Sequence, residues 1–410
     1  AEAHYRQRGD VHRSKKDHAQ ALEDYMHAWR LSPDSAEVGR RLADEYQRLG
    51  DHYLKTQGYQ DAVKDFTRRL DQDARNVWAR LQRARAYLAW AQRDRQRDWL
   101  QGALQDFAEI GRQAPTLVAD LPRRFDQLYS ALGETFSRDD AGEAIHYFGE
   151  LLKKDGKDYR AHAQRGRAYL QRNGNGDADA ALADFNQALA LNSQCGPAYR
   201  GRGELYVERK DFKQAAEDFA RAVELEPGDV NAWSQQLHLL LHQGNLETYR
   251  QRCQAMLPRV QGVEDPLALN LASWLCCLVP NAVTTPEAAV KLAQQSLQQS
   301  TKETELAYRN TLAFAWYRAG KIKDAAEEVD RIFQLREEWN MMPRGALNDV
   351  IIRCLVRARQ NKLADARPDR DAAKLTINRI LSEPSGNWAR KAELRAFVQE
   401  MDEAIMKAGK

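Results

Sequence analysis

The chain has 410 residues, a formal net charge of +3 and 30% charged side chains. That length is too great for one compact core, so several domains or a repeat array are expected. No window approaches the roughly 18 consecutive apolar residues of a membrane-spanning helix. The small net charge does not by itself favour nucleic acid as a partner.

The N-terminal sequence AEAHYRQRGD has no apolar segment, so no signal peptide is visible, and Ala1 in place of Met suggests a fragment of a longer protein. The cysteines show no metal-binding spacing, and we interpret them as buried, reduced thiols. They are Cys195, Cys253, Cys276, Cys277 and Cys354. Reduced thiols favour a cytoplasmic location.

A repeated pattern of small, alanine and aromatic residues runs through the chain. The first copy, residues 1–34, has Gly9 and, 12 residues later, Ala21, then Tyr25. Gly203 and Ala215 in the sixth copy show the same spacing. We expect the small residue of the first helix and the alanine of the second to lie where the two helices cross, and the aromatic to fill the gap toward the next repeat.

Repeats two and three depart from this spacing. Ala43 to Ala62 and Ala84 to Ala103 are each 19 residues, seven more than in the first copy. Seven residues are close to two helical turns, so one extra turn in each helix keeps the buried faces in phase. We expect residues 48–60 and 89–101 to form one raised ridge, for which a solvated charged helix end is the simpler interpretation and a docking site the alternative.

The remaining repeats follow in order. The fourth centres on Gly133, and the fifth on Gly166 and Ala181 with an Asn/Gly-rich turn between them. That turn resembles a calcium loop only faintly, and we favour a plain turn. The later segments are a degenerate seventh repeat (229–262), helices 267–279 and 286–300, a regular ninth repeat around Ala313 and Ala325, a tenth helix pair (345–383) and a charged closing helix (387–408).

The pattern Tyr199-x3-Gly203-x2-Tyr206…Ala215-x3-Phe219 resembles the tetratricopeptide repeat, about 34 residues long. The resemblance covers nearly the whole chain and implies an all-α, right-handed superhelical solenoid of antiparallel helix pairs. We predict an N-terminal array over 1–262, of about seven repeats with repeats two and three elongated. A continuous C-terminal array with a closing helix would follow over 263–410.

A narrower resemblance begins near residue 267. The runs LALNLASWLCCLVPNAVTTPEAAVKLAQQSL and YRNTLAFAWYRAGKIKDAAEEVDRIFQL are similar to the C-terminal repeat tails of planctomycete serine/threonine kinases and WD-repeat proteins. This likeness implies the regulatory part of a larger signalling protein. The chain has no glycine-rich phosphate loop, HRD or DFG motif, so it does not contain the kinase itself.

Sequence motifs for catalysis and for cofactors are lacking. His238 and His242 have the spacing of a metal pair, but the Glu that zincins place after the first His is missing. We therefore predict that the protein is not an enzyme and has neither a cofactor nor a metal site.

The tetratricopeptide resemblance implies that the first helix of each repeat lines a concave groove. The inward positions include Arg6, Arg40, Arg85, Glu134, Arg167, Arg200, Glu204, Asn310 and Phe314. Arg6, Arg40 and Arg200 are each followed four residues later by an acid, which predicts intrahelical ion pairs. Arg85, Glu134 and Arg167 would form a ladder across repeats three to five, either as a structural brace or with one guanidinium free for a ligand.

The predicted function is a protein–protein interaction scaffold that binds a partner segment in the groove. Residues 75–125 hold ten arginines against five acids, which favours an acidic or phosphorylated partner. One alternative is an Arg-rich RNA-binding repeat protein, although the acids at positions 10, 44, 134 and 204 would repel a phosphate backbone. Another is a self-association module.

Overall fold

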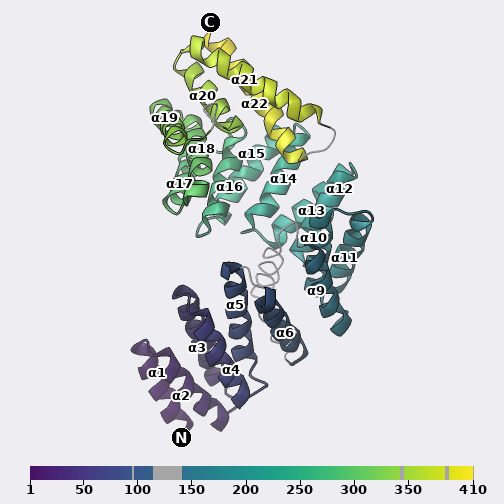
Figure 1. Cartoon of the computed structure of the whole chain (residues 1–410), viewed down its shortest axis with the longest axis vertical. Helices are drawn as coiled ribbons and strands as arrows, with labels where there is room; N and C mark the ends of the chain where they lie inside the picture. Colours follow the sequence, from purple (N-terminus) through teal and green to yellow (C-terminus); the bar gives the residue numbers. More distant parts are fainter. Residues whose placement is uncertain (95–96, 114–140, 342–345, 384–386, 410) are drawn as a thin grey trace. The chain divides into compact units, whose positions relative to one another are not determined.

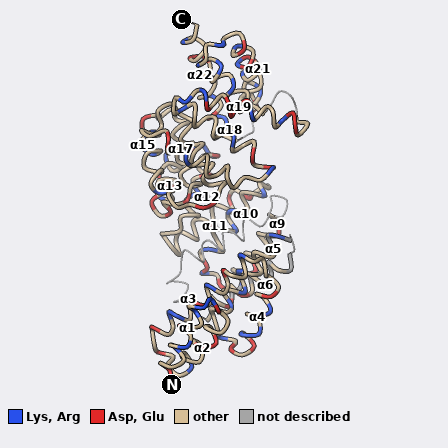
Figure 2. Tube along the Cα trace, turned by 90° about the vertical axis from the view of Figure 1, so that its left-hand side faces the viewer, with Lys and Arg blue, Asp and Glu red and all other residues tan. Residues whose placement is uncertain are grey.

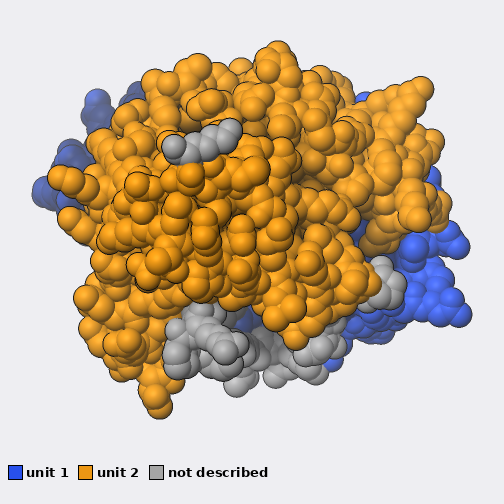
Figure 3. All heavy atoms as spheres, turned by 90° about the horizontal axis from the view of Figure 1, so that it is seen from above, with its two compact units in different colours: residues 1–198 blue, residues 199–410 orange. Residues whose placement is uncertain are grey.

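The computed structural model describes residues 1–94, 97–113, 141–341, 346–383 and 387–409. In these ranges the regular structure is helical, which agrees with the predicted all-α fold of antiparallel helix pairs (Figure 1). The chain divides into two compact units, residues 1–198 and 199–410 (Figure 3). The predicted boundary at 262/263 falls inside the second unit.

Unit 1 contains α1 (Glu2–Ser14), α2 (His18–Leu31), α3 (Ala36–Lys55), α4 (Tyr59–Gln72), α5 (Val77–Asp94), α6 (Arg97–Gln113), α9 (Ala141–Lys154), α10 (Tyr159–Arg172) and α11 (Asp177–Leu191). Helix α12 (Gly196–Glu208) begins in unit 1 and continues into unit 2, because the division falls after Ala198.

Unit 2 continues with α13 (Phe212–Leu225), α14 (Val230–His242), α15 (Leu246–Met256), a short 3-10 turn η2 (Leu257–Arg259), α16 (Pro266–Cys277), α17 (Pro286–Gln298), α18 (Lys302–Arg318), α19 (Ile322–Glu338), α20 (Leu347–Arg359), α21 (Leu363–Ser382) and α22 (Trp388–Ala408). The predicted starts of α17 and α22 agree to within one residue.

The turn inside many hairpins has one repeated design. A residue with positive φ ends the first helix, and the next residue caps the second. Lys16 (φ 61°) precedes Asp17, whose carboxylate accepts from the backbone N–H of Gln20 at 3.2 Å. The same pair recurs at Lys210 and Asp211. Because such a cap satisfies an N–H that the helix leaves unpaired, it fixes where the second helix starts.

The small residue of the first helix lies against the aromatic of the second, in the same repeat. A β-carbon at Gly166 would lie 2.8 Å from the ring of Phe185, and one at Gly203 would lie 2.6 Å from Phe219. This confirms the predicted close crossing. The aromatic was predicted to fill the gap toward the next repeat. Its ring instead packs on the glycine of its own hairpin, a contact that the prediction did not include.

The elongated repeats differ from each other. In repeat three both helices are long, with 18 residues in α5 and 17 in α6. In repeat two, α3 has 20 residues and α4 has 14, so the extra turns lie in the first helix alone. The prediction of one turn per helix is therefore wrong for repeat two. Gly50, which stands 12 residues before Ala62, keeps the ordinary spacing there.

Crowding at the glycine crossing leads to a first prediction. Gly166→Ala gains helix propensity, up to about 1 kcal/mol, but forces its methyl group into the ring of Phe185, which costs about 1–3 kcal/mol. Gly111→Ala in α6 is the control, because no neighbouring atom lies within 4 Å of its added β-carbon. Urea unfolding of unit 1 should show the Gly166 variant less stable than the Gly111 variant by that overpacking cost. Equal stability of the two variants would contradict the close crossing.

Candidate interaction site

Ion pairs join the first helices α1 and α3 in unit 1. The guanidinium of Arg6 lies 2.6 Å from a carboxylate oxygen of Glu37. Asp10 accepts from Arg41 of α3 and from the hydroxyl of Tyr25 at 2.7 Å. Burial and the hydrogen bond to Asp10 together raise the pKa of Tyr25 to about 12. Among the described contacts of Arg6 there is no pair with Asp10, so that intrahelical prediction is wrong.

A further ion pair joins α3 to α5. Asp51 lies 2.8 Å from the guanidinium of Arg85, which also donates to the side-chain oxygen of Gln82 at 2.6 Å. Glu134, the predicted middle of the ladder with Arg85, lies outside the described residues, so the ladder stays a prediction.

Helix α3 presents a continuous polar stripe, because its residues at spacings of three and four share one face. We define the first-helix face of unit 1 as Arg6, Asp10, Glu37, Arg40, Arg41, Asp44, Arg48, Asp51 and Arg85. Arg40 and Arg48 are exposed and form no ion pair with a described residue; Arg40 donates to the backbone carbonyl of Ala36. The predicted pair between Arg40 and Asp44 is therefore not formed.

The other predicted groove residues lie on first helices as well. Arg167 is half-buried on α10 and has interaction partners of its own. On α12, Arg200 lies 3.8 Å from Asp229, and Glu204 accepts from Gln235 at 3.0 Å. Asn310 and Phe314 lie on α18 of unit 2, and both are buried.

Five arginine–aspartate forks inside the hairpins escaped the sequence analysis. Arg165 of α10 donates to both oxygens of Asp184 on α11 at 2.8 Å. Burial disfavours the charged carboxylate of Asp184, but hydrogen bonds from Arg165 and His162 outweigh that cost and lower its pKa. The other forks are Arg8–Asp24, Arg83–Asp106, Arg202–Asp218 and Arg353–Asp369. An arginine before the small residue and an aspartate before the aromatic mark four of the five in the sequence.

In unit 2 the corresponding face is covered by the chain's own last helix. Phe397 of α22 is fully buried, with its ring centroid 5.2 Å from Phe314 of α18 and 5.8 Å from Trp274 of α16. Phe314 is therefore also fully buried. The closing helix was predicted to cover the last apolar face, but it also crosses α14, α16 and α18.

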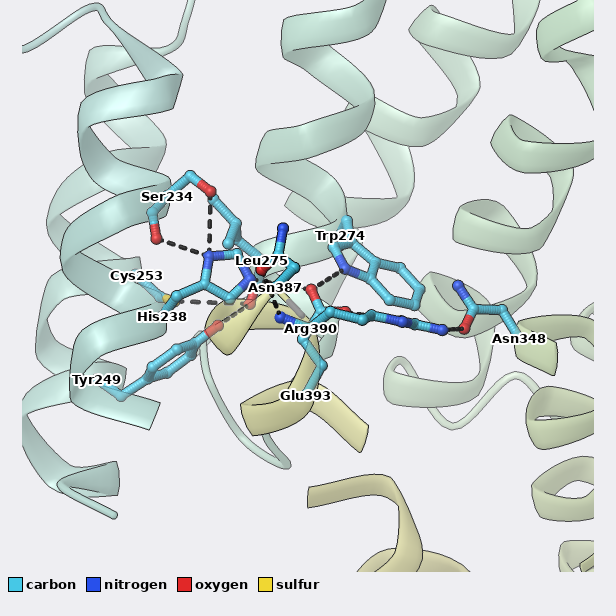
Figure 4. A network of polar contacts seen from close by, with 10 residues as sticks. All are labelled: Ser234, His238, Tyr249, Cys253, Trp274, Leu275, Asn348, Asn387, Arg390 and Glu393. Carbon is cyan, nitrogen blue, oxygen red and sulfur yellow. Dashed lines mark hydrogen bonds and ion pairs between the residues drawn. The ribbon is translucent and has the colours of Figure 1, made fainter. Parts of the chain in front are cut away.

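A polar network holds the N-terminal half of α22 (Figure 4). Glu393 is 7% exposed and accepts from the indole N–H of Trp274 at 2.9 Å. The same oxygen lies 2.9 Å from Nε2 of His238 on α14. Arg390 donates to the second oxygen at 2.7 Å and is held in turn by Asn348 of α20. Helices α14, α16 and α20 therefore all contribute to fixing α22.

A second anchor lies two turns further along α22. The guanidinium of Arg318, at the end of α18, donates to both carboxylate oxygens of Glu400, and its Nε donates to the carbonyl of Cys277 at 2.7 Å. The Arg318 side chain is only 8% exposed. We define the first-helix face of unit 2 by the residues that contact α22, namely His238, Trp274, Phe314, Arg318 and Asn348.

Asn310 joins the first helices α18 and α20 of unit 2 rather than facing a ligand. Its amide donates to Asp349 of α20 at 2.9 Å, and Arg336 of α19 donates to the other oxygen of Asp349 at 2.8 Å. Burial raises the pKa of Asp349.

The two weak metal motifs have other roles. His238 directs Nδ1 to the backbone carbonyl of Ser234 and Nε2 to Glu393, so both ring nitrogens are engaged. In the Asn/Gly-rich turn, Asp177 accepts a fork from Arg172 and the backbone N–H of Gly174. Among the residues with described placement, no group of three His, Cys, Asp or Glu could hold a metal ion. None of the described helices is both long and apolar enough to cross a bilayer.

The Glu393 network predicts a pH dependence. Burial opposes the charged form of Glu393, yet hydrogen bonds from His238, Trp274 and Arg390 outweigh it, so its pKa in the folded protein is lowered. The stabilisation is therefore complete above the unfolded pKa of about 4.3 and is lost as pH falls through the folded value. The free energy of unfolding, measured in urea by hydrogen exchange of α22, should fall as the pH is lowered into the acid range. Glu393→Gln should make this free energy less dependent on pH. Glu403 is half-exposed, so the control Glu403→Gln should leave the pH dependence unchanged.

Comparison with known proteins supports the repeat interpretation. A tetratricopeptide repeat model matches residues 172–230 and 201–248. The solved structures that are similar to this chain include the Cut9–Hcn1 hetero-tetramer of the APC/C, at 16% identity and a TM-score of 0.42, covering 96% of this chain and 75% of that one. Pseudomonas aeruginosa PilF is 18% identical with a TM-score of 0.36, covering 62% of this chain and 100% of that one.

YrrB, described as a tetratricopeptide protein with an unusual peptide-binding site, is 16% identical with a TM-score of 0.34, covering 46% of this chain and 92% of that one. The crossing of Gly203 and Phe219 falls within the segment that the family model matches. The family match therefore identifies tetratricopeptide repeats within residues 172–248.

Proposed function

We propose that this protein is a non-catalytic scaffold that binds a partner polypeptide on the first-helix face of unit 1. The observation that supports this most is the contrast between the two faces. The ion-paired side chains on the unit 1 face keep partial exposure, from 21% for Arg85 to 49% for Glu37. On the unit 2 face, Phe314 is fully buried beneath α22. A preorganised helical array binds a segment with little ordering cost of its own.

The charges of this face favour an acidic or phosphorylated partner. Arg6, Arg41 and Arg85 already form ion pairs with carboxylates of the protein itself. Arg40 and Arg48 do not, and eight residues separate them along α3, about 12 Å at 1.5 Å per residue. Two guanidinium groups at that distance can fork carboxylates or phosphates two turns apart on a partner. Basic and acidic residues alternate along the helices of both units, which limits attraction to a continuous polyanion (Figure 2).

A capture experiment tests this proposal. The immobilised chain is incubated with lysate of the source cells, and captured proteins are quantified by mass spectrometry after nuclease treatment. The double variant Arg40→Glu/Arg48→Glu should reduce capture of the main partner at least tenfold. The control Lys64→Glu/Arg68→Glu makes the same charge change on the exposed side of α4 and should leave capture intact.

The outcomes separate the alternatives. If both double variants capture the partner like the unchanged chain, the face proposal is wrong. Loss of capture after phosphatase treatment of the lysate assigns phosphate as the recognised group. Capture that occurs in untreated lysate and is lost after nuclease treatment would instead favour the RNA-binding alternative.

We further propose that the chain is the regulatory part of a larger signalling protein and works in the cytoplasm. The resemblance of the region from about 267 to kinase-associated repeat tails supports the first point. The five cysteines are free and buried, which fits a reducing compartment. Reading the coding sequence upstream of this chain tests the signalling role, because a kinase domain or WD-type repeats are expected there and an unrelated domain would contradict it.

A further inference from the structure

Helix α22 lies on unit 2 as an amphipathic helix lies in a receptor. One stripe of it is buried, with Leu394, Phe397 and Met401 fully covered and Ile405 at 6% exposure. The opposite side, including Arg395 and Gln399, is exposed. Anchors spaced by three and four residues are the pattern of helix-in-groove recognition.

Acidic residues flank the central anchor on the same face. Glu393 and Glu400 stand seven residues apart, two helical turns, on either side of Phe397. The receiving face supplies a matching donor set: His238 and Trp274 for the first carboxylate, and Arg318 for the second. The residues of α22 that meet this face follow the pattern E-L-x2-F-x2-E-M-x3-I.

The helices that carry the face contact one another without α22. Trp274 of α16 lies edge-to-face on Phe314 of α18, with centroids 5.2 Å apart. Asn310 of α18 donates to Asp349 of α20. Arg318 donates to the carbonyl that ends α16. The first helices thus form a continuous row whose direct contacts do not pass through α22.

The fit of α22 is incomplete at its C-terminal end. A pocket of about 510 Å³ remains there between α18, α20 and α22, lined in part by Tyr317, Arg318, Arg359 and Lys407. Met406, in the last turns of α22, is 59% exposed. The buried anchors of α22 run from Glu393 to Ile405, and Lys374 of α21 donates to Asp402 between them at 2.8 Å. A segment of that length is what a partner helix presents.

We propose that α22 is an exchangeable intramolecular ligand of the first-helix face of unit 2, and that a partner engages this face with an amphipathic helix of the same pattern. The partner helix carries two acidic residues seven apart around a central phenylalanine. In the absence of that partner α22 keeps the face closed. The inference concerns unit 2 alone and does not depend on partner binding to unit 1.

The test uses the full chain and a fluorescent synthetic peptide of residues 387–408 as the probe. In the chain, Phe397→Ala/Met401→Ala weakens the resident helix but leaves every residue of the receiving face unchanged. The peptide should bind this variant at least tenfold more tightly than it binds the unchanged chain, measured by fluorescence anisotropy. A peptide that itself carries Phe397→Ala is the matched control and should lose that binding.

Hydrogen exchange on the unchanged chain is an independent measurement, because it uses no variant that could misfold. The amides of α22 should exchange as a group faster than those of α16 and α18, because α22 opens without the array. Equal exchange in α22, α16 and α18 would overturn the proposal and make α22 an integral part of the core. A folded variant chain that binds no peptide would overturn the proposal as well. So would a variant chain that forms a dimer which excess peptide does not dissociate.

Discussion

Replacing Phe397 by alanine should lower the free energy for the opening of α22 from unit 2 by about 3–5 kcal/mol. The ring is fully buried between Trp274 and Phe314, with both aromatic centroids within 6 Å. Truncation removes the apolar surface and leaves a cavity that the surrounding helices fill only in part. A loss of that size is a large share of the stability of an ordinary domain, about 5–15 kcal/mol.

Urea unfolding followed by hydrogen-exchange mass spectrometry on peptides of α22 measures this loss. Met406→Ala on the same helix is the control, because Met406 is 59% exposed and its truncation should change stability by no more than about 0.5 kcal/mol. If the two variants behave alike, Phe397 is not an anchor of α22.

Replacing Arg318 by leucine should destabilise the same unit by about 3–5 kcal/mol. Burial disfavours its charge, but the fork to Glu400 outweighs that cost and raises the pKa of Arg318. Without the guanidinium, Glu400 keeps a carboxylate that is only 14% exposed, and the carbonyl of Cys277 loses its donor. An uncompensated buried charge accounts for most of the expected loss.

A double-substitution cycle separates that charge effect from packing. Arg318→Leu/Glu400→Leu removes both charges and should recover much of the stability, because apolar replacement of a buried ion pair is often neutral. Arg221→Leu is the surface control, since the pair of Arg221 with Glu224 is largely exposed and its loss should change stability little. A double variant no more stable than Arg318→Leu would mean that the site needs the guanidinium for its packing.

Most of the fold could be predicted from short-range patterns in the sequence. The 12-residue spacing from Gly203 to Ala215 identified the hairpin because a close crossing needs a residue without a side chain. Caps such as Asp17 set the helix starts for equally local reasons. One of the two extra turns of repeat two was wrongly assigned to the second helix because Ala43, seven residues before Gly50, is also small and lies on the same helical face.

The candidate site depends on contacts between residues far apart in the sequence, which no local pattern specifies. Glu393 and His238 are 155 positions apart, and nothing in either segment names the other. The stripe of Leu394, Phe397 and Met401 was readable as one helical face, but the surface it covers was not. Arg6 was assigned to Asp10, whereas its side chain contacts Glu37 on the next first helix and Glu2 on its own.

Hydrogen exchange of the full chain with and without its captured partner tests the central claim of partner binding on unit 1. The account predicts that protection appears in peptides of α1, α3 and α5, centred on Arg40 and Arg48, and is absent from the exposed side of α4. Protection confined to α4, or no protection in unit 1 at all, would contradict it.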